Sequence, residues 1–73
     1  MARKFDISQY PKALETIKPF YEKFKGAKPD GYIITELSAV SHIPIIVVAQ
    51  GVAIVKNEMT PEIQKIINSA IVS

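Results

Sequence analysis

The chain has 73 residues and a mass of 8.1 kDa, which allows a single domain over residues 1–73. It has no cysteine, which excludes disulfide bonds and thiolate metal sites, and its 48% hydrophobic and 22% charged residues exclude a chain disordered by composition. The net charge of +2 is too small to indicate a nucleic-acid partner by itself.

Apolar residues three and four positions apart predict a first helix over about residues 8–25. This series comprises Ile7, Tyr10, Leu14, Ile17, Tyr21 and Phe24. We expect Ser8 to be the N-cap and Gly26 to end the helix. Pro19 lacks an N–H and clashes with the carbonyl of Glu15, so we expect a kink or a break there.

The stretch from Lys28 to Gly31 is predicted to be a turn, and the segment that follows it allows two structures. In the first, Ile43–Ala49 and Val52–Val55 are strands on either side of Gln50-Gly51, because β-branched residues favour strands. Both faces of that hairpin would be apolar and would need cover. A hairpin therefore indicates an assembling protein, with an α+β, helix–β-hairpin–helix fold as the alternative fold class.

In the second structure the same segment is helical. Thr35 caps a short helix over Glu36–Val40, residues 41–43 form a turn, and Pro44 opens the next helix at its first position. This helix would turn three valines inward: Val48, Val52 and Val55. The fold class would then be mainly α, a small domain of four short helices, and we adopt this as the leading prediction.

The last predicted helix spans Thr60 to Val72. Thr60 is the expected cap, Pro61 takes the first helical position, and Glu62 favours the positive end of the helix dipole. Its apolar face comprises Ile63, Ile66, Ile67, Ala70 and Ile71. A helix this short is marginal alone, so this face must dock on the rest of the chain.

The middle segment resembles the helix-turn-helix core of small transcription regulators over residues 34–55. The resemblance lies in Ile34-Thr35-Glu36-Leu37-Ser38-Ala39, then Ile43-Pro44, then Val48 and Val52. His42 stands where the turn of that family usually has glycine. The stretch Thr60–Ile66 is also similar to the helix that closes small repressor domains. The resemblance implies a DNA-associated regulator, expected to be a dimer that binds double-stranded DNA.

In such regulators the second helix of the motif enters the major groove. The base-facing positions would be Pro44, Ile45, Ile46, Ala49, Gln50 and Ala53, of which Gln50 alone can form hydrogen bonds with a base. Basic residues outnumber acidic ones seven to three in residues 1–28, and acidic residues outnumber basic ones four to two afterwards. The expected phosphate contacts are Arg3, Lys4, Lys12, Lys23, Lys25 and Lys28.

A second hypothesis treats the chain as a self-assembling structural or accessory subunit of a capsid, filament or membrane complex. It rests on the excess of Ile and Val in residues 43–55 and on an apolar surface formed by Ile45, Ile46, Ala49 and Ala53. A third hypothesis is an adaptor or inhibitor that presents Ile45 and Ile46 to another protein.

The sequence does not contain the patterns of an enzyme or a metal protein. His42 is the only histidine, and no nucleophile–base pair, phosphate loop or carboxylate pair is evident. We therefore expect no catalysis, cofactor or metal. Residues 33–55 are long enough to span a bilayer, but Glu36, His42 and Gln50 interrupt them, so we expect a cytoplasmic protein without a transmembrane span.

Overall fold

The computed structural model describes residues 10–72, with side chains as far as residue 70. Within this range the chain forms four helices and no strand: α1 (Ala13–Phe24), α2 (Asp30–Ser41), α3 (Ile45–Lys56) and α4 (Pro61–Val72). The predicted mainly α fold is confirmed. The alternative hairpin is wrong, because Gln50 and Gly51 lie inside α3.

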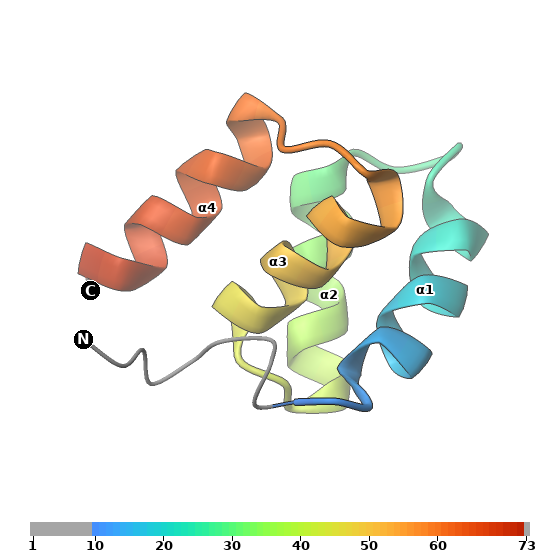
Figure 1. Cartoon of the computed structure of the whole chain (residues 1–73). Coiled ribbons are helices and arrows are strands. Elements are labelled where there is room, and N and C mark those ends of the chain that lie inside the picture. Colours follow the sequence, from blue (N-terminus) through green and yellow to red (C-terminus); the bar gives the residue numbers. More distant parts are fainter. Residues whose placement is uncertain (1–9, 73) are drawn as a thin grey trace.

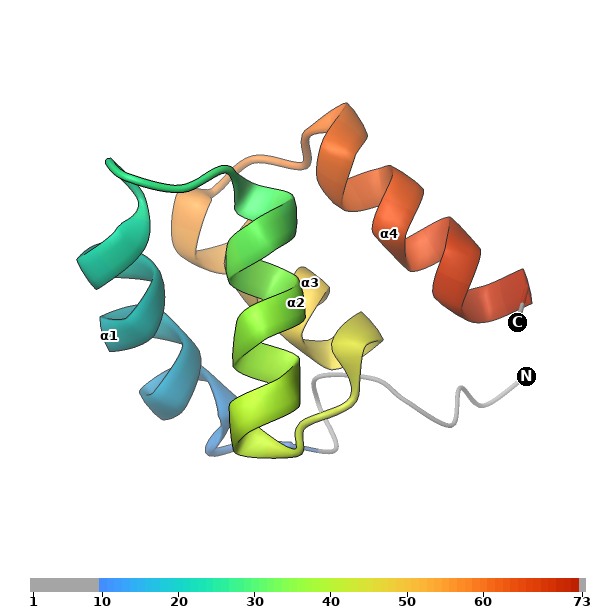
Figure 2. The same ribbon diagram turned by 180° about the vertical axis from the view of Figure 1, so that it is seen from behind.

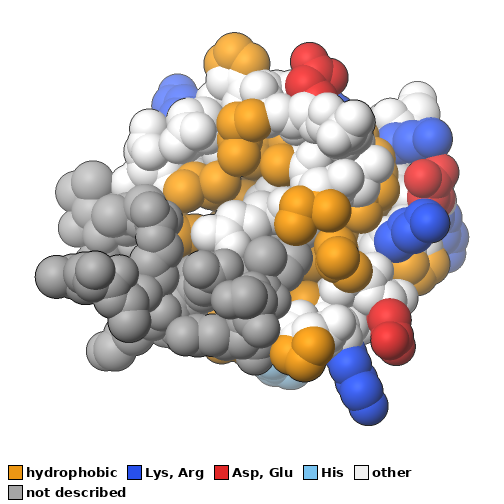
Figure 3. All heavy atoms as spheres, viewed as in Figure 1, with side chains coloured by type: hydrophobic (Ala, Val, Ile, Leu, Met, Phe, Trp, Pro, Cys, Tyr) orange, Lys and Arg blue, Asp and Glu red, His pale blue; other side chains and the backbone are white. Residues whose placement is uncertain are grey.

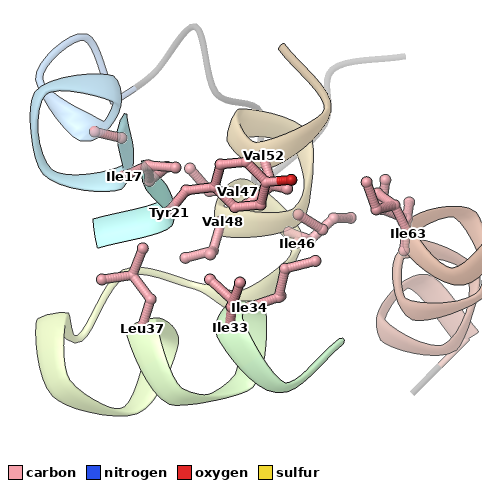
Figure 4. Packing of buried hydrophobic residues seen from close by; sticks show 13 residues of the cluster. Ile17, Tyr21, Ile33, Ile34, Leu37, Ile46, Val47, Val48, Val52 and Ile63 are labelled. Carbon is pink, nitrogen blue, oxygen red and sulfur yellow. The ribbon is translucent and has the colours of Figure 1, made fainter. Parts of the chain in front are cut away.

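Helix α3 lies at the centre of the molecule. In Figure 1, α1 and α4 lie on opposite sides of α3, and the view from behind in Figure 2 shows α2 across the remaining side. Figure 4 shows side chains of all four helices meeting around α3. The buried core comprises Ala13, Ile17, Tyr21, Ile33, Ile34, Leu37, Ile46, Val47, Val48, Ala49, Val52, Ile63 and Ile67.

This central position explains why a segment rich in β-branched residues is helical. Val47, Val48 and Val52 are fully buried, and α3 packs against α1, α2 and α4. The intrinsic cost of Val and Ile in a helix is a few tenths of a kcal/mol per residue. Full burial of one such side chain contributes about 1.5–3 kcal/mol, so tertiary packing outweighs the local preference for a strand.

The predicted helix boundaries in the first half of the chain need correction. Helix α1 begins at Ala13 and not near residue 8, and it continues through Pro19 without a break. Buried side chains on both sides of the proline, Ile17 and Tyr21, hold the helix in place despite the missing hydrogen bond. The predicted cap Ser8 and the first residue of the apolar series, Ile7, lie outside the described residues.

Helix α2 begins at Asp30, six residues before the predicted short helix and inside the predicted turn. The carboxylate of Glu62 in α4 accepts a hydrogen bond from the backbone N–H of Gly31 at 2.9 Å. A side chain from another helix thus satisfies an N–H that helix ends leave unpaired. This support is distant in sequence, so local turn chemistry could not reveal it.

Helix α4 follows the prediction. The hydroxyl of Thr60 accepts a hydrogen bond from the N–H of Ile63 at 3.3 Å, and Pro61 is the first helical residue. Ile63 and Ile67 are buried, and Ile66 and Ala70 are half-buried against the core. The side chain of Ile71 lies outside the described residues.

Candidate interaction surfaces

Helices α2 and α3 are joined by the three-residue turn His42–Pro44. His42 adopts a left-handed conformation with φ 63°, and its N–H donates to the carbonyl of Ser38 at 3.1 Å. The hydroxyl of Ser38 donates to the carbonyl of Ile43 at 2.8 Å, and the hydroxyl of Ser41 accepts from the N–H of Ile43 at 3.3 Å. Side-chain hydrogen bonds therefore hold the turn, and a histidine stands where glycine would be unstrained.

The apolar face of α3 that was predicted to be an exposed interface is covered by the chain itself. Ile46 is 7% exposed and Ala49 is fully buried. Figure 4 shows Ile46 pointing toward Ile63 of α4. Ile45 and Ala53 are half-buried against the same core. The prediction that these residues present a free surface is therefore wrong for Ile46 and Ala49, because the sequence could not show where α4 docks.

The same burial affects the positions expected to read DNA bases. From Ile46 to Ala49 every side chain of α3 is buried, and Gln50 is half-buried. The single cation of α3, Lys56, pairs with Asp30 at 2.5 Å. In this arrangement, few atoms in the first turns of α3 are accessible for contact with the major groove of DNA.

The described basic residues expected to meet phosphates divide between the two ends of α1. Lys12 precedes the helix, whereas Lys23, Lys25 and Lys28 lie at or after its last turn. Lys25 pairs with Glu22 at 3.0 Å, and Lys23 lies 5.4 Å from the ring centre of Phe24. Figure 3 shows positive and negative side chains alternating along the α1 side of the molecule. Arg3 and Lys4 lie outside the described residues.

A partly apolar groove of about 200 Å³ lies between α1 and α2. Its lining residues are Phe20, Phe24, Lys28, Tyr32, Ile33, Glu36 and Val40. The two aromatic rings from α1 lie 4.9 Å apart. Tyr32 is 48% exposed and Val40 is 59% exposed, which leaves two large apolar side chains of α2 in contact with solvent.

Sequence reasoning missed this groove. Its signal is the four-residue spacing of Tyr32, Glu36 and Val40, which places them on one face of a helix. The sequence predicts a helix that begins only at Glu36, which leaves Tyr32 outside any predicted element. An apolar surface on α2 becomes evident only when the helix is extended back to Asp30.

A second hollow of about 390 Å³ separates the start of α3 from α4, lined by Ile45, Lys65, Ile66, Ser69 and Ala70. On the far end of α3, Ile54 is 52% exposed and lines neither hollow. The α1–α2 groove differs from both places because it combines exposed apolar side chains with a lysine and a glutamate.

Three titratable side chains meet at the start of α2. Asp30 accepts hydrogen bonds from Lys56 and, at 3.3 Å, from the hydroxyl of Tyr21. Burial, together with the nearby Asp30 carboxylate, raises the pKa of Tyr21. The hydrogen bond to Asp30 raises the pKa of Lys56. The chemistry of this cluster is that of a structural ion pair.

The described residues contain no group of three or more His, Cys, Asp or Glu side chains that could hold a metal ion. In that part of the chain, none of the helices has the length and hydropathy that a membrane crossing needs. Comparison of the chain with protein family models, with characterised proteins and with solved structures gives no match.

Proposed function

We propose that this chain is a non-enzymatic interaction module that binds apolar side chains of a protein partner in the α1–α2 groove. The half-exposed pair Tyr32 and Val40 beside Phe20 and Phe24 supports this function. Apolar grooves between helices receive amphipathic helices of partner proteins through side chains one helical turn apart. This is a form of the adaptor hypothesis, with the binding surface moved from Ile45 and Ile46 on α3 to the groove between α1 and α2.

The experiment is a selection of displayed amphipathic helical peptides on the immobilised protein. We expect the selected peptides to carry apolar residues at i and i+4 and to lose binding to Val40→Asp. Ile54→Asp is the matched control, because Ile54 is similarly exposed but lines neither hollow. Peptides that bind Val40→Asp and the wild-type protein equally would contradict this function, provided that circular dichroism shows both variants to be folded.

Association with double-stranded DNA is the second candidate. One support is the pair of 12-residue helices, α2 and α3, joined by a three-residue turn, which is the order that the resemblance implies. The other is the group of three exposed lysines near the end of α1. In this case the contacts would be to phosphates, and replacing Lys23, Lys25 and Lys28 by Gln should lower the salt dependence of duplex binding by about three in log–log slope. Absence of salt-dependent duplex binding at low ionic strength would exclude this candidate.

The expectations that the protein has no catalytic activity and is cytoplasmic stay predictions from the sequence.

A further inference from the structure

The α1–α2 groove carries one cation and one anion, Lys28 and Glu36. Glu36 is exposed, and its carboxylate has no ion pair or hydrogen bond with another described residue. The ammonium group of Lys28 lies 4.9 Å from the ring centre of Tyr32 and has no carboxylate partner among the described residues. An apolar groove with one charge of each sign that no described residue neutralises fits an occupant that brings the opposite charges.

The two charges lie on either side of Tyr32 in the sequence, four residues away in each direction. Tyr32, Glu36 and Val40 follow one face of α2, with a rise of about 6 Å from each to the next. Lys28 precedes the helix and lines the same groove. Along this face the order is therefore cation, aromatic ring, anion and aliphatic side chain.

This order is complementary to itself. If a second α2 lies antiparallel across the first, with the two-fold axis near Tyr32, Lys28 of each copy faces Glu36 of the other. The two Tyr32 rings then meet at the axis, and Val40 of each copy lies toward the Phe24 end of the opposite groove. A symmetric contact of this kind uses one patch twice, as two-fold interfaces do.

We propose that the occupant of the α1–α2 groove is the same groove of a second copy of this chain, in a two-fold symmetric dimer. This inference rests on the proposed function, because it assigns the partner for the same groove. The dimer would cover Tyr32 and Val40, two of the large apolar side chains that the single chain leaves exposed. A chain of this size buries only roughly 60% of the surface that it exposes when unfolded, less than a larger domain does, so association adds stability.

Charge reversal tests the pairing directly. We would measure sedimentation equilibrium of the wild-type protein, of Lys28→Glu, of Glu36→Lys and of an equimolar mixture of the two variants. Each variant alone places like charges together twice and should dimerise about tenfold more weakly than the wild-type protein. The mixture should recover the wild-type affinity as a heterodimer, because both of its cross-pairs are again opposite in charge.

Val40→Asp and Ile54→Asp provide a test that does not depend on surface ion pairs. We expect Val40→Asp to abolish the dimer and Ile54→Asp to leave it unchanged, with both variants helical by circular dichroism. A mixture of the charge variants that binds no more tightly than either variant alone would overturn the inference. A dimer lost in Ile54→Asp and kept in Val40→Asp would also overturn it, by placing the contact elsewhere.

The wild-type protein also separates this inference from the proposed function. A wild-type monomer at millimolar concentration would overturn the dimer. If the groove still binds selected helical peptides in a Val40-dependent way, the occupant is a different protein and the proposed function stands. If the wild-type protein neither dimerises nor binds such peptides, both proposals fail.

Discussion

The carboxylate of Asp30 and the ammonium group of Lys56 lie 2.5 Å apart and join the first residue of α2 to the last residue of α3. The Tyr21 hydroxyl of α1 donates to the same carboxylate, and Glu62 of α4 accepts from the next backbone N–H, at Gly31. All four helices therefore meet at the start of α2. This junction links α1 and α2 at one end of the groove between them, in addition to the apolar core that both helices share.

We expect Lys56→Met to lower the free energy of unfolding by about 1–2 kcal/mol, measured by urea titration. The variant keeps an apolar stem but leaves the Asp30 carboxylate without its cation. A fully buried pair would cost about 3–5 kcal/mol to break, and the smaller value reflects side chains that are still 21% and 13% exposed. Lys25→Met is the control, because its pair with Glu22 is about half exposed and should contribute less than about 0.5 kcal/mol. Equal losses in the two variants would contradict a special role for the junction.

Stability should fall at alkaline pH because of the same cluster. The pKa values of Tyr21 and Lys56 are both raised in the folded state, so the folded chain holds these protons more tightly than the unfolded chain. Their contribution to stability is complete below the ordinary values of 10.0 and 10.5 and disappears as pH rises through the folded values. Urea titrations between pH 8 and 11 should show a steeper decline for the wild-type protein than for Tyr21→Phe combined with Lys56→Met. Parallel declines would contradict this assignment.

His42→Gly should stabilise the protein by about 0.5–1 kcal/mol. His42 has φ 63°, a conformation that costs a residue with a side chain about 1–2 kcal/mol and that glycine adopts without this cost. Glycine also has more conformational freedom in the unfolded chain, which offsets part of the expected stabilisation. Asn57 provides a matched control at φ 59°, because asparagine tolerates this conformation better. Asn57→Gly should therefore change the free energy of unfolding less than His42→Gly. A destabilised His42→Gly would indicate that the imidazole ring contributes to the turn.

The parts of the fold that sequence predicted correctly are those with local causes. Thr60 and Pro61 mark the start of α4 by their own chemistry, and the hydroxyl of Thr60 does accept the N–H of Ile63. The turn at His42 was expected from the residues on either side of it. Each of these predictions depends on residues within a few positions of one another, and the tertiary packing favours the same local structure.

The parts that failed depend on residues distant in sequence. Asp30 and Gly31 favour a turn locally, but Glu62, 31 residues after Gly31, allows a helix to begin there. Ile46 was expected to be exposed because the sequence predicts that α4 docks on the rest of the chain but does not show that it docks on α3. The groove between α1 and α2 does not follow from the sequence because the predicted start of α2 lies after the observed one. The exposed Tyr32 lies in the first turn of α2, ahead of that predicted start.

The docking of α4 provides the last prediction. Ile63 is fully buried where α4 meets the core, and its replacement by Ala should cost about 2–4 kcal/mol. Ile66 lies on the same helix but is only half-buried beside the hollow between α3 and α4, so Ile66→Ala should cost about 1 kcal/mol. A domain of this size has a total stability of roughly 4–11 kcal/mol, so this loss is a large fraction of it. Ile63→Ala should therefore also speed amide hydrogen exchange in α4, through local opening of this helix, before the whole chain unfolds. Exchange that accelerates equally in α1 and α4 would instead show that the four helices unfold as one unit, with α4 as firmly held as the rest.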